Sequence, residues 1–260
     1  MMVVSGIPSA RKKLDRAKFH LDELDRAVHA FREDSPYKFD MGSAGNEPYK
    51  PDFWIDVTVS EAPPVPNEWA LITGDILTNL RGSLDHAVFP HIHRMKPDLD
   101  RKHIKYPIHD RKEQWEPKKP WFERAVRDVI GDSQPYRAAD HGRHPLRVLR
   151  ELVNMDKHRD LVIANYAVDD FQVAPQDFFR VVWRTVFLEE MVTGTRVARA
   201  HLQLVEAIEG HQWKEFHCWV DYGETIKVPD VNERFSLLGK MKTLVQFVGQ
   251  LLNDLEQAGC

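Results

Sequence analysis

The sequence predicts an α+β fold in which a helical bundle forms the core and an antiparallel β-sheet segment lies at one side. Four long stretches carry apolar residues three and four positions apart, the spacing of one helix face, and they cover residues 9–33, 68–90, 144–158 and 231–257. Residues 160–222 are rich in β-branched and aromatic residues, which favour strands. A separate alternating stretch at 53–59 predicts one more strand.

The N-terminal third should form a helix, a loop, a strand and a second helix. The first helix has one apolar face, formed by Leu14, Ala17, Leu21, Leu24, Val28 and Phe31. Residues 34–50 contain prolines and glycines without periodicity, so we expect a loop there. The strand at 53–59 is followed by three closely spaced prolines that stop it. Asn67 can then cap the second helix, and Pro90 should end or kink it, because proline removes a helical hydrogen bond.

Shorter elements are expected in the middle of the chain. Residues 94–120 are rich in charged residues and proline, which predicts a solvated loop. A short helix should cover Trp121–Ile130, closed by Gly131. Pro145 suits the first turn of the helix at 144–158, because its missing N–H has no partner at that position anyway.

The C-terminal part should contain a meander of strands and a final helix. Thr193-Gly194-Thr195 is typical of a turn between antiparallel strands, whereas residues 196–207 fit a strand or a helix equally well. Asp230 and Glu233 have the spacing of a capping box at the start of the final helix. Because this amphipathic helix needs the earlier helices to cover its apolar face, we expect residues 1–260 to form a single domain.

The composition limits the classes of function. The 260-residue chain has a net charge of −4 with histidine neutral, so a nucleic-acid partner would need a local basic patch. Two cysteines can build neither a disulfide framework nor a cysteine-based zinc site. No secretory signal and no membrane-spanning apolar run is visible, which predicts a cytoplasmic protein without a membrane partner. Glycine-rich phosphate loops and the serine-hydrolase motif are absent, and we expect no cofactor.

Two segments place polar residues within amphipathic helices, and they are Asn79-Leu80-Arg81-Gly82-Ser83-Leu84-Asp85-His86 and Asn154-Met155-Asp156-Lys157-His158-Arg159. In the first, Asn79, Ser83 and His86 share one helical stripe. Arg81 and Asp85 form an i, i+4 pair on the adjoining stripe. Polar residues in this pattern indicate either a catalytic site or a buried polar network.

Both interpretations stay open. In the first, an ion-pair network locks two helices together, and its members are Arg81, Asp85, Asp156, Lys157 and Arg159. Asp156 falls on the apolar side of its helix, so we expect Arg81 or Arg159 to pair with it. Loss of Asp156 would then leave the arginine buried without a counter-charge. In the second, a histidine moves a proton near neutral pH while an arginine stabilises a phosphate.

The first segment resembles a known signature. Arg81, four intervening residues and His86 match the Arg-x4–6-His motif of the HEPN superfamily of helical bundle proteins, many of which are metal-independent ribonucleases of toxin and antiviral defence systems. The resemblance implies a homodimer in which arginine and histidine of two subunits meet and cleave RNA through its own 2′-hydroxyl. Arg81 would hold the phosphate and His86 would act as acid or base. Asn79 or Asp85 would orient the imidazole, and His158 would supply a second proton-transfer group.

Three cations in or beside the second segment are candidates for substrate binding, and they are Lys157, Arg159 and Arg150. Together, residues 74–86, 134–136 and 154–159 also resemble a widespread group of uncharacterised bacterial helical proteins. The chain differs from the HEPN pattern in the early position of the motif, in Gly82 after the arginine and in its large β segment.

The sequence leaves two further interpretations open. Aromatic residues of the β segment, either core residues or a partner-binding face, would allow a non-catalytic dimeric module that binds an unknown protein partner; they are Trp183, Phe187, Trp213 and Trp219. A metal site would need Pro90 to break its helix and bring together Asp85, His86, His91 and His93. These histidines lack the spacing of common zinc motifs, and we expect no metal.

Overall fold

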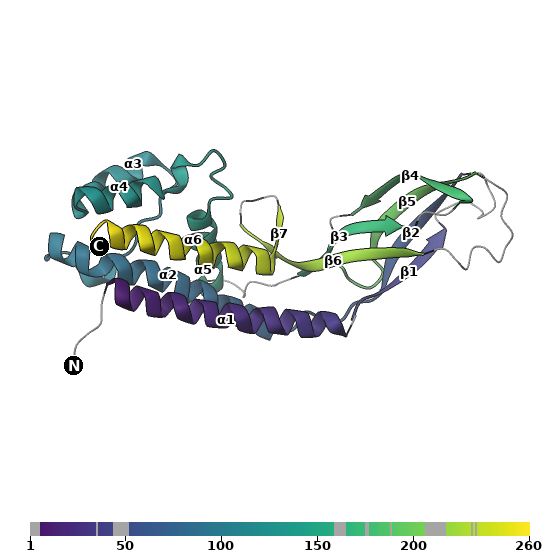
Figure 1. Ribbon diagram of the computed structural model, residues 1–260, viewed down its shortest axis with the longest axis horizontal. Helices are drawn as coiled ribbons and strands as arrows, with labels where there is room; N and C mark the ends of the chain where they lie inside the picture. The colour runs from purple at the N-terminus through teal and green to yellow at the C-terminus, as the bar shows by residue number, and fades with distance from the viewer. Residues whose placement is uncertain are drawn as a thin grey trace. The chain divides into compact units, whose positions relative to one another are not determined.

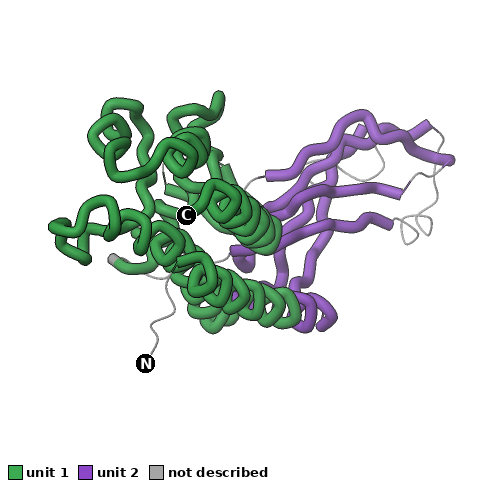
Figure 2. The backbone as a smooth tube through the Cα atoms, turned by 60° about the vertical axis from the view of Figure 1, so that its left-hand side comes forward, with its two compact units in different colours: residues 1–27, 66–164, 226–260 green, residues 28–65, 165–225 purple. Residues whose placement is uncertain are grey.

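The computed structural model describes residues 6–34, 36–43, 52–158, 165–174, 177–187, 189–205, 217–229, 231 and 233–260. Within them it has the predicted α+β architecture, with α-helices and antiparallel sheets (Figure 1). The chain divides into two compact units (Figure 2). Unit 1 comprises Met1–Ala27, Pro66–Ala164 and Ile226–Cys260, and unit 2 comprises Val28–Val65 and Asn165–Thr225. A single domain over residues 1–260 stays a prediction.

Unit 1 is built on long helices. They are α1 (Ile7–Glu33, of which residues 7–27 belong to this unit), α2 (Glu68–Met95), α5 (Pro145–His158) and α6 (Leu237–Gln257). α2 packs against α5 and α6, and α5 packs against α6. The predicted apolar faces are buried in this core, including Leu14, Leu24, Leu80, Leu84, Leu149 and Leu252. Burial of each such side chain stabilises the fold by about 1.5–3 kcal/mol, which is why the periodicity locates these helices well.

α2 is longer than the sequence predicts. Pro90 lies inside the helix, which continues to Met95, so the prediction that the helix ends near residue 90 is wrong. The residues just beyond the proline, His91 and Ile92, are buried. Their packing holds the helix together at the point where proline removes one backbone hydrogen bond.

α6 begins later than predicted. Residues Arg234–Ser236 form the short strand β7, and Ser236 caps the helix by accepting a bond from the Gly239 N–H at 3.2 Å. Glu233 pairs with Arg143 instead of forming a capping box. The other member of the expected box, Asp230, lies outside the described residues.

The stretch at 94–120 is more ordered than a solvated loop. It contains η1 (Arg101–His103), α3 (Lys112–Trp115) and most of η2 (Glu116–Trp121), and it is followed by α4 (Arg124–Asp132) and η3 (Pro135–Arg137). Ile104, Tyr106, Ile108 and Trp115 are buried. Alternate burial between 104 and 108 fixes an extended segment whose intervening side chains can face solvent.

Unit 2 contains a four-stranded sheet with the order β1-β2-β5-β4. Its strands are β1 (Lys38–Ser43), β2 (Asp52–Glu61), β5 (Arg196–Leu204) and β4 (Phe179–Val186), all paired antiparallel. The alternation predicted at 53–59 is confirmed, because Phe53, Ile55, Val57 and Val59 are buried. The loop predicted at 34–50 is wrong for residues 38–43, where pairing with β2 overrides the weak local preference. The ambiguous stretch at 196–207 contains a strand.

A second sheet has the order β3-β6-β7. In it β3 (Asn165–Val173) pairs antiparallel with β6 (Cys218–Lys227). The strands therefore do not form the simple meander that was expected, because β5 pairs with β2 as well as with β4. The turn predicted around Gly194 is confirmed: its φ is +88° and its N–H donates to the Val59 carbonyl at 2.8 Å. Leu161–Ile163, expected to begin the β segment, lie outside the described residues.

Across the residues that the structure describes, we find no helix that is both long enough and apolar enough to cross a bilayer.

Candidate functional site

Unit 1 contains a cleft of about 410 Å³ between α2, α5, η2 and the extended segment after η1. Its lining residues are Arg81, Asp85, His103, Lys105, Tyr106, Pro107, Ile108, His109, Lys118, Trp121, Arg150, Val153, Asn154 and Lys157. Five of these are lysine or arginine, two are histidine and one is a carboxylate. In a chain with a net charge of −4, this is the local basic patch that an anionic ligand needs.

Arg81 and Asp85 lie on the wall that α2 contributes. Their closest charged atoms, Nη2 and Oδ1, are 2.9 Å apart. Arg81 Nη2 also donates to the Tyr106 carbonyl at 2.8 Å, and the Tyr106 N–H donates to Asp85 Oδ1 at 2.8 Å. The pair therefore fastens the extended segment to α2, as the predicted i, i+4 spacing allows. Both described bonds of Arg81 use Nη2, so Nε and Nη1 remain for a ligand.

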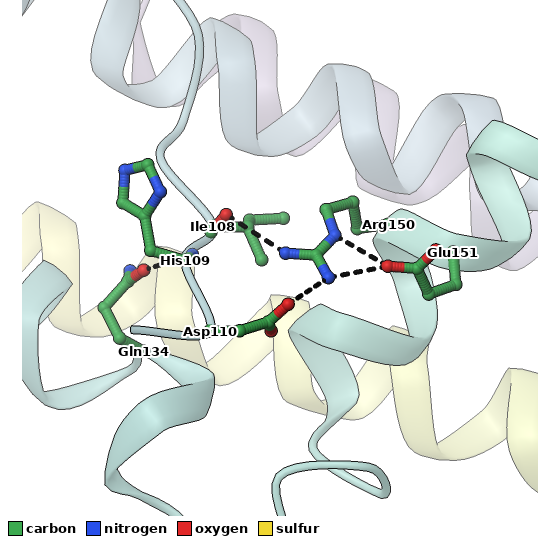
Figure 3. A network of polar contacts seen from close by, with 6 residues as sticks. All are labelled: Ile108, His109, Asp110, Gln134, Arg150 and Glu151. Carbon is green, nitrogen blue, oxygen red and sulfur yellow. Dashed lines mark hydrogen bonds and ion pairs between the residues drawn. The ribbon is translucent and has the colours of Figure 1, made fainter. Parts of the chain in front are cut away.

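Arg150 fastens the other end of the same segment to α5 (Figure 3). Its guanidinium donates to Asp110 Oδ2 at 2.6 Å, to Glu151 Oε1 at 2.6 Å and to the Ile108 carbonyl at 3.3 Å. Two carboxylates thus neutralise this cation, and they hold its pKa above the ordinary value against the effect of burial. Arg150, expected to bind substrate, lines the cleft but is engaged in holding its wall.

His109 is a histidine of the cleft that the sequence analysis missed. Its backbone N–H donates to Gln134 Oε1 at 2.9 Å, and Gln134 is fully buried and donates to the Pro107 carbonyl at 3.0 Å. In Figure 3 the His109 ring points away from the Arg150 network. Burial, and then the charges of Lys118 and Arg150, lower the pKa of His109 below its usual 6.5, so the ring is neutral at pH 7.

The Nε2 atom of His109 is buried and has no hydrogen-bond partner among the described residues. A buried polar atom without a partner is rare, and one explanation for it is a ligand or water atom that the chain itself does not supply. His109 also lines the cleft, so its imidazole lies next to any group bound there.

The outer rim of the cleft carries cations and one aromatic ring. Lys105, Lys157 and His103 are exposed. Lys118 Nζ lies 3.7 Å from the centroid of the Trp121 ring, a cation–π contact that holds the half-buried indole in place. Charged groups at the rim and a planar ring beside them suit a ligand that has both phosphates and flat bases.

Asn79 and His86 do not line the cleft, because they lie on the side of α2 that contacts α1. His86 is exposed and its Nδ1 is 2.7 Å from Ser9 Oγ. The Asn79 amide donates to the Asp75 carbonyl at 2.8 Å and accepts from Lys13 Nζ at 3.4 Å. The structure therefore separates the residues expected to form one catalytic group: Asn79 and His86 face α1, whereas Arg81 and Asp85 face the cleft.

The second polar segment reaches the same cleft through Asn154 and Lys157. Nothing is described of the His158 side chain, and Arg159 lies outside the described residues. Asp156 does not pair with Arg81, whose bonds go to Asp85 and Tyr106.

Asp156 instead lies against Gly74 of α2, where a Cβ would be only 2.6 Å from Asp156 Oδ1. A larger residue at position 74 would therefore displace the Asp156 carboxylate from this position. Burial, and then the nearby carboxylate of Asp75, raise the pKa of Asp156 above its ordinary value. The ion-pair role expected for Asp156 is therefore wrong for Arg81, because its charged neighbour on α2 is another acid.

Replacement of Asp156 by asparagine should slightly stabilise the protein at pH 7, by about 0.5 kcal/mol, since the site is half-exposed and solvent screens it. A raised folded-state pKa penalises the charged form, so the wild type loses stability as the pH rises through that pKa. The advantage of the variant should therefore disappear toward pH 3. Urea unfolding at several pH values measures this, with exposed Asp98→Asn as the control. Destabilisation of more than about 2 kcal/mol at pH 7 would instead indicate a buried ion pair.

The cleft residues that the sequence analysis missed all come from residues 103–121, and they are His103, Lys105, His109, Lys118 and Trp121. The charged composition of residues 94–120 predicts a solvated loop instead. The available signal was the apolar alternation between Ile104 and Ile108, which indicates a packed segment rather than a free one.

In the described part of the chain, no three residues of the histidine, cysteine, aspartate and glutamate types gather closely enough to hold a metal ion.

The comparisons with known proteins assign no family. Neither the family models, nor the curated proteins, nor the solved structures contain a match to this chain.

Proposed function

We propose that the unit 1 cleft binds the phosphates of single-stranded RNA and that the chain is a metal-independent endoribonuclease acting there. The observation that carries the proposal is the composition of the cleft: Arg81 and Arg150 are paired with carboxylates, but no ion pair is described for Lys105, Lys118 or Lys157, and the His109 ring lies in the same lining. A concentrated positive charge attracts phosphodiesters. A neutral histidine in the same cleft can accept a proton near pH 7.

Binding would use two lysines for which no ion pair is described, together with the guanidinium atoms of Arg81 that do not contact Asp85. Lys105 and Lys157 stand at the rim, and Arg81 offers Nε and Nη1 from the α2 wall. Arginine matches the geometry of a phosphate with two parallel donors, whereas lysine acts as a point charge. Trp121 supplies a ring on which a base can stack.

The reaction would follow the RNA's own chemistry. His109 accepts the proton of a ribose 2′-hydroxyl, and the 2′-oxygen attacks the adjacent phosphorus. The bond from phosphorus to the 5′-oxygen breaks, and His103 donates a proton to that oxygen, leaving a 2′,3′-cyclic phosphate and a 5′-hydroxyl. Arg81 stabilises the charge that develops on the phosphoryl oxygens. No oxidant, reductant or metal enters this balance.

This is the reaction class that the HEPN resemblance implies, with a different pair of histidines. His86 lies on the α1 side of α2, so His103 and His109 take the roles assigned to His86 and His158. Assembly as a homodimer, and a place in toxin or phage defence, follow from the same resemblance and stay proposals.

A non-catalytic interaction module is the second candidate, and exposed tryptophans in unit 2 favour it. The exposed fractions of Trp183 and Trp219 are 46% and 47%. Large exposed aromatic residues often mark a surface that binds a partner protein. Trp213 lies outside the described residues, and Phe187 is half-buried beneath the Arg196 guanidinium, 4.9 Å from its ring centroid.

The test is incubation of purified protein with end-labelled single-stranded RNA and with DNA of the same sequence, each with and without a chelator. We expect RNA cleavage that survives chelation and products that carry a 2′,3′-cyclic phosphate. DNA should stay intact, because it lacks the 2′-hydroxyl. Cleavage of both polymers would refute the 2′-hydroxyl mechanism. If RNA is neither bound nor cleaved, the interaction module becomes the better assignment.

A further inference from the structure

Unit 1 has a second cleft, of about 770 Å³, which none of the roles above uses. It is lined by Lys112, Trp115, Lys119, Arg127, Asp128, Gly131, Asp132, Tyr136 and Arg137. Four of these residues are lysine or arginine and two are aspartate, so this cleft also has an excess of positive charge. We infer that it holds the continuation of the same RNA strand that occupies the first cleft, an inference that rests on the proposed function.

One segment forms the wall between the two clefts. Lys118 and Trp121 line the first cleft, whereas Lys112, Trp115 and Lys119 line the second. All five belong to α3 and η2, which follow one another without a break from Lys112 to Trp121. A strand that crosses this segment would span about 10 Å, the width of a helix with its side chains. That distance corresponds to about three phosphates of a stacked strand, at about 3.4 Å each.

The carboxylates of the second cleft do not prevent its cations from binding a phosphate. Arg137 pairs with Asp132 at 3.1 Å, and Arg127 is 3.8 Å from Asp128. These carboxylates are exposed, and ion pairs in that setting contribute little, so the arginines can exchange them for a phosphate at small loss. Lys119 pairs in the same exposed way with Glu116 at 2.8 Å, and Lys112, for which no ion pair is described, gives the cleft its net positive charge.

Aromatic rings accompany the cations along this path. Trp121 lines the first cleft and the half-buried Tyr136 lines the second, whereas Trp115, also in the lining of the second cleft, is buried and offers no open ring face to a base. Gly131 makes room for the Trp115 indole, because a Cβ there would be 3.2 Å from Nε1. Cations that follow a backbone and rings that stack on bases are the two components of a single-strand binding surface. A duplex keeps its bases stacked inside the helix, so they could not stack on these aromatic rings.

The inference predicts that affinity depends on RNA length. We would measure fluorescence anisotropy with a labelled uridine dinucleotide and with an oligouridylate of about ten nucleotides, a length within the range of single-strand binding sites. Both probes would carry 2′-O-methyl groups, which block attack by the 2′-oxygen and so keep the RNA intact. The wild type should bind the longer probe at least about tenfold more tightly, because only this probe reaches the second cleft.

Charge-removing variants separate the two clefts. Lys112→Gln with Arg127→Gln should weaken only the longer probe. It should also reduce the slope of log affinity against log salt by about 1.4, since each phosphate contact contributes about 0.7 for a single strand. Lys105→Gln with Lys157→Gln should weaken both probes. The matched control is Lys12→Gln with Lys18→Gln, which removes two exposed charges of α1.

The outcomes distinguish the two proposals. If the wild type binds neither probe, the proposed function is wrong. The inference alone is wrong if the wild type binds both lengths equally, or if the second-cleft variant weakens both probes alike. It is also wrong if the α1 control reproduces the loss. Thermal unfolding of each variant verifies that the loss reflects binding rather than folding.

Discussion

Replacement of Asp85 by alanine should lower the free energy of unfolding by about 3 kcal/mol. The side chains of Asp85 and Arg81 are 25% and 16% exposed, and Asp85 Oδ1 accepts from both the Arg81 guanidinium and the Tyr106 N–H. Burial raises the pKa of Asp85 despite these donors, so the carboxylate is retained against a desolvation penalty. Its removal leaves the Arg81 cation without its counter-charge and the Tyr106 N–H without its acceptor, which is the strongly destabilising way to break such a pair.

Two variants test that explanation. Asp85→Asn keeps an oxygen for the Tyr106 N–H and should lose less stability than Asp85→Ala. The double variant Arg81→Met, Asp85→Leu removes both charges and should be more stable than the sum of its single changes predicts. Urea unfolding measures all of these, with exposed Asp98→Ala as a control expected to change stability by no more than about 0.5 kcal/mol. A loss below about 1 kcal/mol for Asp85→Ala would show that the pair does not hold the cleft wall.

RNA cleavage should fall by about a hundredfold or more in His109→Ala, because a positioned acid or base contributes at least that much. His86→Ala should retain nearly all activity, since its ring lies against Ser9 on the other side of α2. The measurement is kcat/KM on a labelled oligoribonucleotide, with thermal unfolding to verify the fold. The opposite result, with His86 essential and His109 dispensable, would place the reaction at the HEPN-like motif and leave the cleft without a catalytic role.

The pH dependence of kcat/KM is a second test of His109 as the group that accepts the proton. His109 must be neutral to accept a proton, and burial lowers its pKa. The acid limb of kcat/KM should therefore lie below pH 6.5, with activity falling as the pH drops through the pKa of His109. In His109→Ala the residual activity should lack this limb. A limb that persists there belongs to a different group.

The helices and the central strand were predictable because burial imposes a period on the sequence. Leu80, Leu84 and the alternating residues of β2 repeat at the spacing of their element. β1 was not predictable, because its residues become a strand only when β2 pairs with them. The end of α2 was misjudged at Pro90, since the rule for proline contains no information about the packing of Ile92.

The candidate site also contains residues that the sequence predicts and residues that it does not. The sequence analysis named Arg81, Asp85, Arg150 and Lys157, which the structure brings to one cleft. Helical periodicity placed Asn79 and His86 on a shared stripe, and that stripe turned out to face α1. Periodicity shows which residues share one face of a helix, but it does not show which element packs against that face. His103 ends the short helix η1 and His109 follows an extended segment, so helical periodicity does not relate either residue to the long helices.

The interleaving of the two units has a consequence for the order of events during folding. β2 pairs with β5, and Asp52 meets Gln203, so this sheet joins residues that are about 150 positions apart in the chain. Unit 1 likewise includes both the first long helix and the last one. Contacts between such distant residues form slowly, since a long loop must close before they stabilise anything. Neither unit can be completed during synthesis until most of the polypeptide has emerged, and an N-terminal fragment that stops before β5 would leave one backbone edge of β2 without its hydrogen-bonding partner.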